Sequence, residues 1–184
     1  MASPGMPMRR CLIAALSGAA ALFIAMGGRA GLPASSAAGG PSWMHSDAAN
    51  RHVTFVVTAA QGGANGTLNF NGYARGQMTV TVPAGWRVHI DFDNGGAGAL
   101  SHSLEVIRAV EPVPPQAVAP AIPKAQTSDL VAGTPPLQQD SADFTAAPAG
   151  AYLWFCGVPT HGTSGMWNRF VISAGARLPS VKVR

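Results

Sequence analysis

Short runs of β-branched and aromatic residues, each ended by glycine, proline or asparagine, most limit how this chain can fold. In the clearest run, residues 86–92, an apolar side chain stands at every second position, as in a strand with one buried face. Comparable runs occupy residues 53–58, 67–73, 77–82, 102–107, 150–156 and 166–172, with a kink or turn expected at Asn71 and Gly72. A helical bundle is disfavoured because 22 of the 184 residues are glycine and 15 are proline, and both break helices. The pattern predicts an all-β protein, either an antiparallel sandwich or a barrel.

The first 30 residues have the composition of a targeting segment. Arg9 and Arg10 precede an apolar run over residues 11–28, which is the pattern of an export signal. The alternative is an uncleaved N-terminal membrane anchor, since a run of this length can just span a bilayer. Both interpretations predict an exported protein with a periplasmic or otherwise extracytoplasmic domain. In the second, residues 11–28 attach the protein to the outer face of the cytoplasmic membrane.

Beyond this segment the sequence predicts a linker, one monomeric domain and a short tail. Residues 31–50 are rich in Ala, Gly, Ser and Pro, which is typical of a flexible linker. The domain is expected over residues 51–176, with a C-terminal tail over residues 177–184. Residues 110–148 contain eight prolines and little periodicity. So long an aperiodic segment predicts a proline-rich insertion that covers one side of the domain before the last two strands.

The charge distribution argues against a nucleic-acid partner. The chain has 12 Lys and Arg against 8 Asp and Glu, and three of the cations lie in residues 1–30, which contain no acid. The remainder therefore has nine cations against eight anions, and no run of Lys or Arg. Nucleic-acid binding needs clustered cations to contact phosphates, so this class of partner is not expected.

The residues with the most specific chemistry are Cys156, His161 and Met166, which are spaced Cys-x4-His-x4-Met. The cysteine ends one predicted strand and the methionine begins the next. Glycines and a proline between them predict a tightly turned loop that can bring the three donors together. His102, at the start of another predicted strand, is the candidate for a fourth ligand.

Two imidazoles, a thiolate and a thioether are the donor set of a mononuclear type 1 (blue) copper site that transfers electrons. Zinc is the first competitor, but it prefers more thiolates or a carboxylate. A copper-binding or delivery module is an alternative function, although such proteins expose clusters of Met or Cys. A Cys-His-dependent enzyme is a less favoured alternative, because it would leave Met166 without a role. We therefore expect one copper ion and no catalytic activity.

The sequence resembles the cupredoxins, and closely the sulfocyanin family among them, over roughly residues 65–173. The resemblance is carried by the segments Phe70–Tyr73, Pro83–Trp86, His102–Ser103 and Cys156–Trp167. It implies a cupredoxin-like Greek-key β-sandwich with His102, Cys156, His161 and Met166 as the copper ligands. It also implies electron transfer in a respiratory chain, between a redox donor and a terminal oxidase or cytochrome.

Residues near the predicted ligands are candidates for tuning the site. Apolar bulk around the sulfur is expected from the four aromatic residues Trp154, Phe155, Trp167 and Phe170, and Ser103 is a candidate hydroxyl beside a ligand. Electrons are expected to pass through His161, whose loop contains small and apolar residues. His89 is expected to point to solvent on its strand, and His45 and His52 are not expected to bind the metal.

Overall fold

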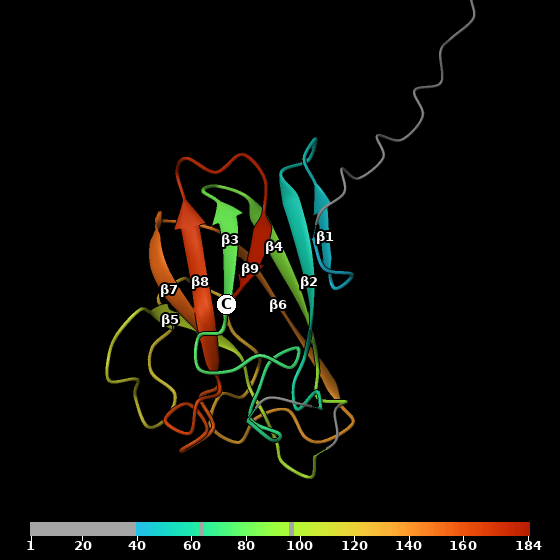
Figure 1. Ribbon diagram of the computed structural model, residues 1–184, viewed down its shortest axis with the longest axis vertical. Helices are drawn as coiled ribbons and strands as arrows, with labels where there is room; N and C mark the ends of the chain where they lie inside the picture. The colour runs from blue at the N-terminus through green and yellow to red at the C-terminus, as the bar shows by residue number, and fades with distance from the viewer. Residues whose placement is uncertain (1–39, 63–64, 96–97) are drawn as a thin grey trace, which may run out of the picture. The chain divides into compact units, whose positions relative to one another are not determined.

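The computed structural model describes residues 40–62, 65–95 and 98–184. In these ranges the chain forms strands in two facing sheets and no helix (Figure 1). The strands are β1 (Met44–Asp47), β2 (His52–Thr58), β3 (Met78–Pro83), β4 (Arg87–Asp93), β5 (Glu105–Arg108), β6 (Gln139–Thr145), β7 (Gly150–Phe155), β8 (Trp167–Ser173) and β9 (Ser180–Val183). Among the residues described, none belongs to a helix long and apolar enough to cross a membrane.

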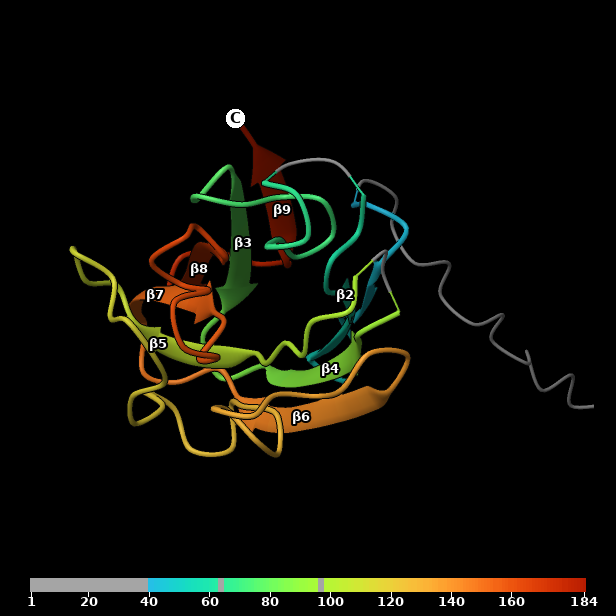
Figure 2. The same ribbon diagram turned by 90° about the horizontal axis from the view of Figure 1, so that it is seen from below.

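One sheet has the strand order β1-β2-β4-β6 and the other the order β5-β7-β8-β3-β9. Viewed from below, β4 and β6 lie in one layer and β3, β7 and β8 in the other (Figure 2). Two neighbouring pairs, β2 with β4 and β3 with β8, are parallel, and the other pairs are antiparallel. The chain therefore crosses between sheets, and the predicted Greek-key sandwich is confirmed, although its sheets are mixed and not purely antiparallel as the sequence pattern predicted.

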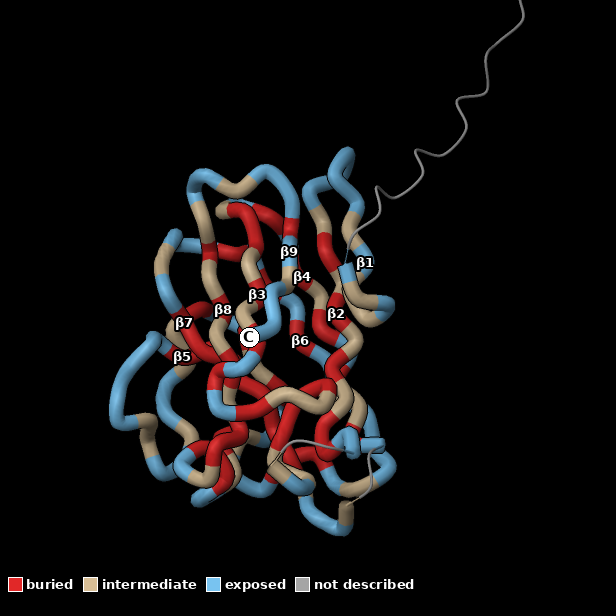
Figure 3. The backbone as a smooth tube through the Cα atoms, viewed as in Figure 1, coloured by how far each residue is buried: buried red, intermediate tan, exposed pale blue. Residues whose placement is uncertain are grey.

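Buried residues alternate with half-buried or exposed ones along β2, β4 and β8 (Figure 3), and buried apolar residues of both sheets form one core cluster. Trp154 on β7 is fully buried and stacks on Phe170 of β8 at 5.7 Å between ring centroids. Phe55, from β2 of the opposite sheet, makes a T-shaped contact with Trp154, and the two ring centroids are 5.3 Å apart. These rings bind the two sheets together immediately before the segment that carries Cys156.

The strand predicted over residues 67–73 is wrong. Phe70 makes only isolated bridges to Ala59 and Tyr73. Asn71 and Gly72 have φ of 52° and 80°, in the left-handed region that a strand cannot contain. The turn expected at Asn71 and Gly72 is therefore present, but the residues on either side of it form a loop and not a strand.

The sandwich is also larger than the sequence predicted. β1 lies within the predicted linker and pairs with β2, and β9 lies within the predicted tail and pairs with β3. β6 lies within the predicted insertion of residues 110–148 and pairs with β4. All three are edge strands in which at least half of the residues are exposed, so their burial pattern is weak in the sequence. The expected leader over residues 1–30 lies outside the described residues.

Candidate metal site

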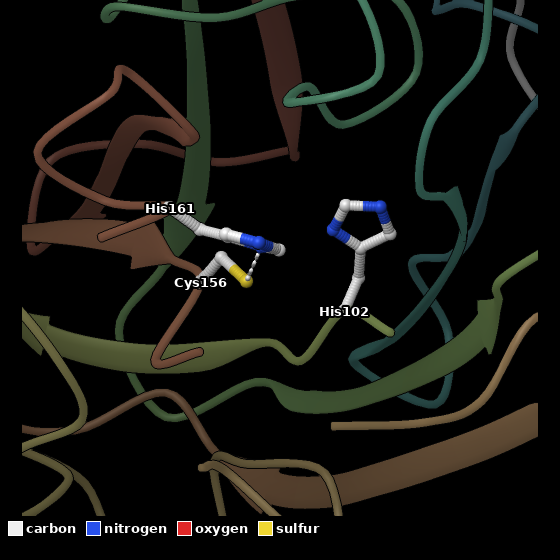
Figure 4. A group of neighbouring side chains, drawn as sticks. All are labelled: His102, Cys156 and His161. Carbon is white, nitrogen blue, oxygen red and sulfur yellow. Dashed lines mark hydrogen bonds between the residues drawn. The ribbon is translucent and has the colours of Figure 1, made fainter. Parts of the chain in front are cut away.

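Three of the predicted ligands meet at one end of the sandwich. One ligand atom each from His102, Cys156 and His161 lies within 4.8 Å of the others (Figure 4). The Cys156 sulfur is 3.6 Å from Nδ1 of His161, and the two imidazole ring centroids are 5.0 Å apart. No other such group of His, Cys, Asp and Glu occurs in the part of the chain that the structure describes.

The loop between β7 and β8 positions two of these side chains. Cys156 directly follows β7, and its backbone N–H donates to the carbonyl of Met166 at 3.1 Å. The N–H of Met166 donates to the carbonyl of His161 at 2.9 Å. Gly162 packs on the ring of Phe155, where any Cβ would collide with the ring. These bonds and this close approach fix the loop against the end of the sheet.

His102 is held by the insertion and not by a strand, because β5 begins only at Glu105. Its N–H donates to the carbonyl of Thr134 at 3.2 Å, and the N–H of Thr134 donates back at 2.7 Å. Gly133 lies so close that a Cβ there would be 3.0 Å from the backbone of His102. The segment preceding β6 therefore positions this ligand.

The proline-rich insertion also contacts the loop that carries Cys156 and His161. The N–H of Ala117 donates to the carbonyl of Gly157 at 2.8 Å, and the N–H of Thr160 donates to the carbonyl of Pro115 at 2.7 Å. The sequence predicted a covering role but not these partners. The insertion thus connects both ligand-bearing segments.

The ionisation of the three groups fits a metal. His102 is fully buried, and neither of its ring nitrogens has a hydrogen-bond partner among the described residues. Burial, and then the neighbouring His161, lower the pKa of His102 to about 4, and burial lowers the pKa of His161. Burial raises the pKa of the Cys156 thiol. Neutral imidazoles can donate lone pairs to a cation, and metal binding would displace the thiol proton.

The Cys156 sulfur accepts a hydrogen bond from a backbone group. The N–H of Ser103 donates to it at 3.4 Å, whereas the Ser103 hydroxyl oxygen is 3.8 Å away. That hydroxyl donates to the carbonyl of Leu130 at 2.9 Å and accepts from the N–H of Gly157 at 3.0 Å. The predicted hydroxyl therefore joins the insertion to the ligand loop.

Met166 and two of the four predicted aromatic residues, Trp154 and Phe170, belong to the main apolar core, whereas Phe155 and Trp167 pack in a second cluster. Met166 is fully buried within the main apolar cluster, and its backbone bonds with both Cys156 and His161. Trp154, Phe155 and Phe170 are also fully buried. Trp167 is half-buried, and Arg169 lies 5.7 Å from its ring centroid. The site is thus mostly closed to water, with His161 9% exposed.

Two ionisable residues differ from what the sequence suggested. His89 is not simply solvated: Nδ1 is 2.8 Å from Asp143 and Nε2 is 2.9 Å from Asp91. Glu105 is fully buried in β5, where Oε1 accepts from the N–H of Val118 and Oε2 has no partner in the described ranges. Nothing in the sequence indicated that Glu105 is buried. A single carboxylate within a short apolar run is typical of the solvent-facing side of an edge strand.

Residues 40–182 match the model of the family described as the Sulfocyanin (SoxE) domain. Rusticyanin from Acidithiobacillus ferrooxidans is 32% identical over 111 residues, which are 56% of this chain and 54% of that protein. The chain thus spans about half the length of that relative. Sulfocyanin from Sulfolobus acidocaldarius is 28% identical over 140 residues, covering 71% of this chain and 68% of the relative. A solved rusticyanin from Thiobacillus ferrooxidans aligns with a TM-score of 0.45 and 26% identity, over 67% of this chain and 82% of that one.

Proposed function

The chain belongs to the sulfocyanin family of cupredoxins, and we propose that it is a blue copper protein that transfers single electrons and has no catalytic activity. One observation carries this proposal. Two neutral, buried imidazoles and a buried thiol converge within 4.8 Å, and both nitrogens of one imidazole lack a partner among the described residues. Buried polar groups without partners are costly, so the cluster is best explained by a bound cation.

The proposed ligands are His102, Cys156, His161 and Met166. The first three supply two nitrogens and a sulfur, the set typical of a trigonal type 1 copper site. Met166 is proposed as the weak axial ligand because it is buried and its backbone is bonded to both Cys156 and His161. A thioether favours copper over zinc in this set.

The protein contributes to electron transfer by holding the ligands in fixed positions and by excluding water from them. Bound copper supplies the one-electron couple between Cu(I) and Cu(II). His102 is fixed by Thr134, and the loop holding His161 is fixed by its own backbone bonds and by the insertion. Because these ligands belong to restrained segments, little rearrangement accompanies a change of charge. Burial of Cys156 keeps the sulfur from solvent and argues against a role as an enzymatic nucleophile.

We propose that electrons pass by way of His161, since it retains some exposure while His102 and Cys156 are fully buried. Pro159 and Thr160 beside it are exposed and would contact a redox partner. A small contact of this kind suits a brief encounter. The partners are proposed to be an electron donor and a terminal oxidase or cytochrome of a respiratory chain.

The proposed cellular placement is supported by the N-terminal sequence. We propose that residues 1–30 direct export, so that the copper domain acts on the outer side of the cytoplasmic membrane, either free in the periplasm or anchored through residues 11–28. Fractionation of native cells, followed by N-terminal sequencing, tests both alternatives.

The decisive experiment is an absorption and EPR spectrum of the full chain after loading with Cu(II). We expect an intense visible thiolate-to-Cu(II) band that disappears in Cys156→Ser and in His102→Gln. His89→Gln is the matched control and should keep the band. A colourless protein in which Cys156 is readily alkylated would support a Cys-His-dependent enzyme instead. Rapid loss of copper to a chelator would support a delivery module.

A further inference from the structure

The ligand loop has a second attachment, made by the segment from Asn65 to Arg75. One carbonyl, that of Ser164, accepts from Nδ2 of Asn65 at 2.9 Å and from Nη2 of Arg75 at 2.8 Å. The same Nη2 donates to Oδ1 of Asn65 at 3.0 Å, and the backbone N–H of Arg75 donates to the carbonyl of Gly165 at 2.8 Å. Two consecutive carbonyls immediately before Met166 are therefore held by a segment about 90 residues earlier in the chain.

The close approach of Arg75 depends on a glycine. Gly165 has φ of 106°, a conformation that other residues rarely adopt. A Cβ at this position would lie 2.6 Å from Cγ of Arg75. The side chain of Arg75 therefore lies flat against the backbone of Gly165. This close contact is possible only because residue 165 has no side chain.

The orientation of Arg75 is unusual for an exposed arginine. The hydrogen bonds of its guanidinium go to a carbonyl and an amide oxygen, and no carboxylate bonds to it among the described residues. The side chain of Asn65 is also held in place by hydrogen bonds, since Nδ2 donates to the carbonyl of Leu68 at 2.9 Å as well as to that of Ser164. Its φ of 58° is one that asparagine tolerates better than most residues. Both side chains are thus pre-oriented toward the loop.

We propose that Asn65 and Arg75 form a clamp that positions Met166, a role that rests on the proposed copper site. Met166 follows Gly165 directly, and its backbone bonds to Cys156 and His161. A displacement of Ser164 or Gly165 would therefore move the axial sulfur relative to the other ligands. The clamp holds this end of the loop from outside, while the insertion holds the other end through Gly157 and Thr160.

Four variants test the clamp. Asn65→Gly removes the side-chain bonds but keeps the positive φ and the charge. Arg75→Lys keeps the charge but loses the planar fork, and Arg75→Gln loses both. Arg177→Gln is the matched control, because Arg177 is exposed and makes none of these contacts. We expect all three clamp variants, but not the control, to release copper to a chelator roughly 10–100-fold faster and to shift the thiolate-to-Cu(II) band and EPR parameters.

Hydrogen exchange in the metal-free protein tests the clamp independently of copper chemistry. The N–H of Gly165 bonds to Gly162 and that of Met166 to His161. Both amides should exchange at least tenfold faster in Asn65→Gly and Arg75→Lys than in the wild type or in Arg177→Gln. Unchanged exchange, with a blue copper spectrum identical to that of the wild type, would overturn the clamp and leave the proposed function intact. Faster exchange in a chain that gives no blue spectrum would uphold the clamp and reject the proposed function.

Discussion

The backbone N–H of Ser103 lies 3.4 Å from the sulfur of Cys156, closer than the hydroxyl of the same residue. The donor to the sulfur therefore survives any change of the Ser103 side chain. The hydroxyl has a separate task, since it donates to Leu130 and accepts from Gly157. The hydroxyl, 3.8 Å from the sulfur, makes the longer of the two contacts, so tuning of the sulfur comes mainly from the backbone N–H and attachment of the insertion from the hydroxyl.

Ser103→Ala should accordingly lower the free energy of unfolding clearly while leaving the reduction potential nearly unchanged. The substitution leaves the buried N–H of Gly157 and the carbonyl of Leu130 without their partner, at a cost of about 1–3 kcal/mol in the free energy of unfolding. Denaturation with urea measures the loss, and cyclic voltammetry measures the potential. Ser141→Ala on β6 is the control, because its side chain is exposed. A large drop in potential without loss of stability would contradict this division of roles.

The sequence predicted the fold class and the convergence of Cys156 and His161 because both have strong local patterns. Alternation along β4 and the Cys-x4-His-x4-Met spacing each report structure within a few residues. It failed at residues 67–73, where the turn expected at Asn71 and Gly72 is present with left-handed backbone angles but the residues on either side of it form no strand. Turn conformations of this kind depend on tertiary contacts, such as the bond from the N–H of Thr58 to the Asn71 side chain.

Contacts between residues far apart in the chain could not be predicted from the sequence either. The insertion was recognised by its prolines, but nothing in its composition indicated that Thr134 would hold His102. Neither could the burial of Glu105 be foreseen, because it depends on Val118 of the insertion lying over β5. Sequence patterns specify faces of strands, whereas these features depend on which loops cross one another.

Met166→Gln should lower the reduction potential. An amide oxygen is a harder donor than a thioether and stabilises Cu(II) relative to Cu(I). Spectroelectrochemistry of the loaded protein gives the potential directly. Met78→Leu serves as the control, since Met78 is equally buried but lies at the start of β3 and is not a proposed ligand. An unchanged or raised potential in Met166→Gln would remove Met166 from the ligand set.

Gly157→Ala should loosen the insertion from the ligand loop. A Cβ at this position would lie 2.7 Å from the Cβ of Ala117, 2.9 Å from Oε1 of Glu105 and 3.0 Å from the carbonyl oxygen of Leu130. Ala117 and Leu130 belong to the insertion, and the same Oε1 of Glu105 accepts from the N–H of Val118 there. The insertion must therefore shift, at a cost of about 1–3 kcal/mol. Limited proteolysis should then cleave within residues 110–138 faster than in the wild type. Gly175→Ala, where a Cβ would meet nothing, is the control; equal cleavage of all three proteins would count against the contact.

His89→Gln should weaken the pH dependence of stability at the outer face of β4. The hydrogen bond to Asp143 is the main cause that raises the pKa of His89, with a smaller contribution from Asp91. Because the folded-state pKa is raised, the stabilisation is complete below the unfolded pKa of about 6.5 and is lost as pH rises through the folded value. Both aspartates are well exposed, so the effect is at most about 1 kcal/mol. Urea denaturation at pH 5.5 and 9 should show it in the wild type and not in the variant.

Glu105→Gln should stabilise the protein at neutral and higher pH but not in acid. Burial raises the pKa of Glu105 from 4.5 to about 7, and Oε2 has no partner among the described residues to compensate a charge. The neutral carboxyl is therefore favoured in the folded state, and its stabilising effect is complete below pH 4.5 and is lost as pH rises through about 7. A pKa difference of this size corresponds to a change of ~3 kcal/mol in the free energy of unfolding between acid and alkaline conditions.

The glutamine variant keeps an acceptor for the N–H of Val118 but cannot ionise. Urea denaturation of the metal-free protein at pH 4 and pH 8 should thus give equal free energies of unfolding for the two proteins in acid and a higher value for the variant at pH 8. Glu111→Gln, at an exposed position, controls for net charge, and a variant that gains no stability at pH 8 would show that Glu105 is already neutralised or solvated.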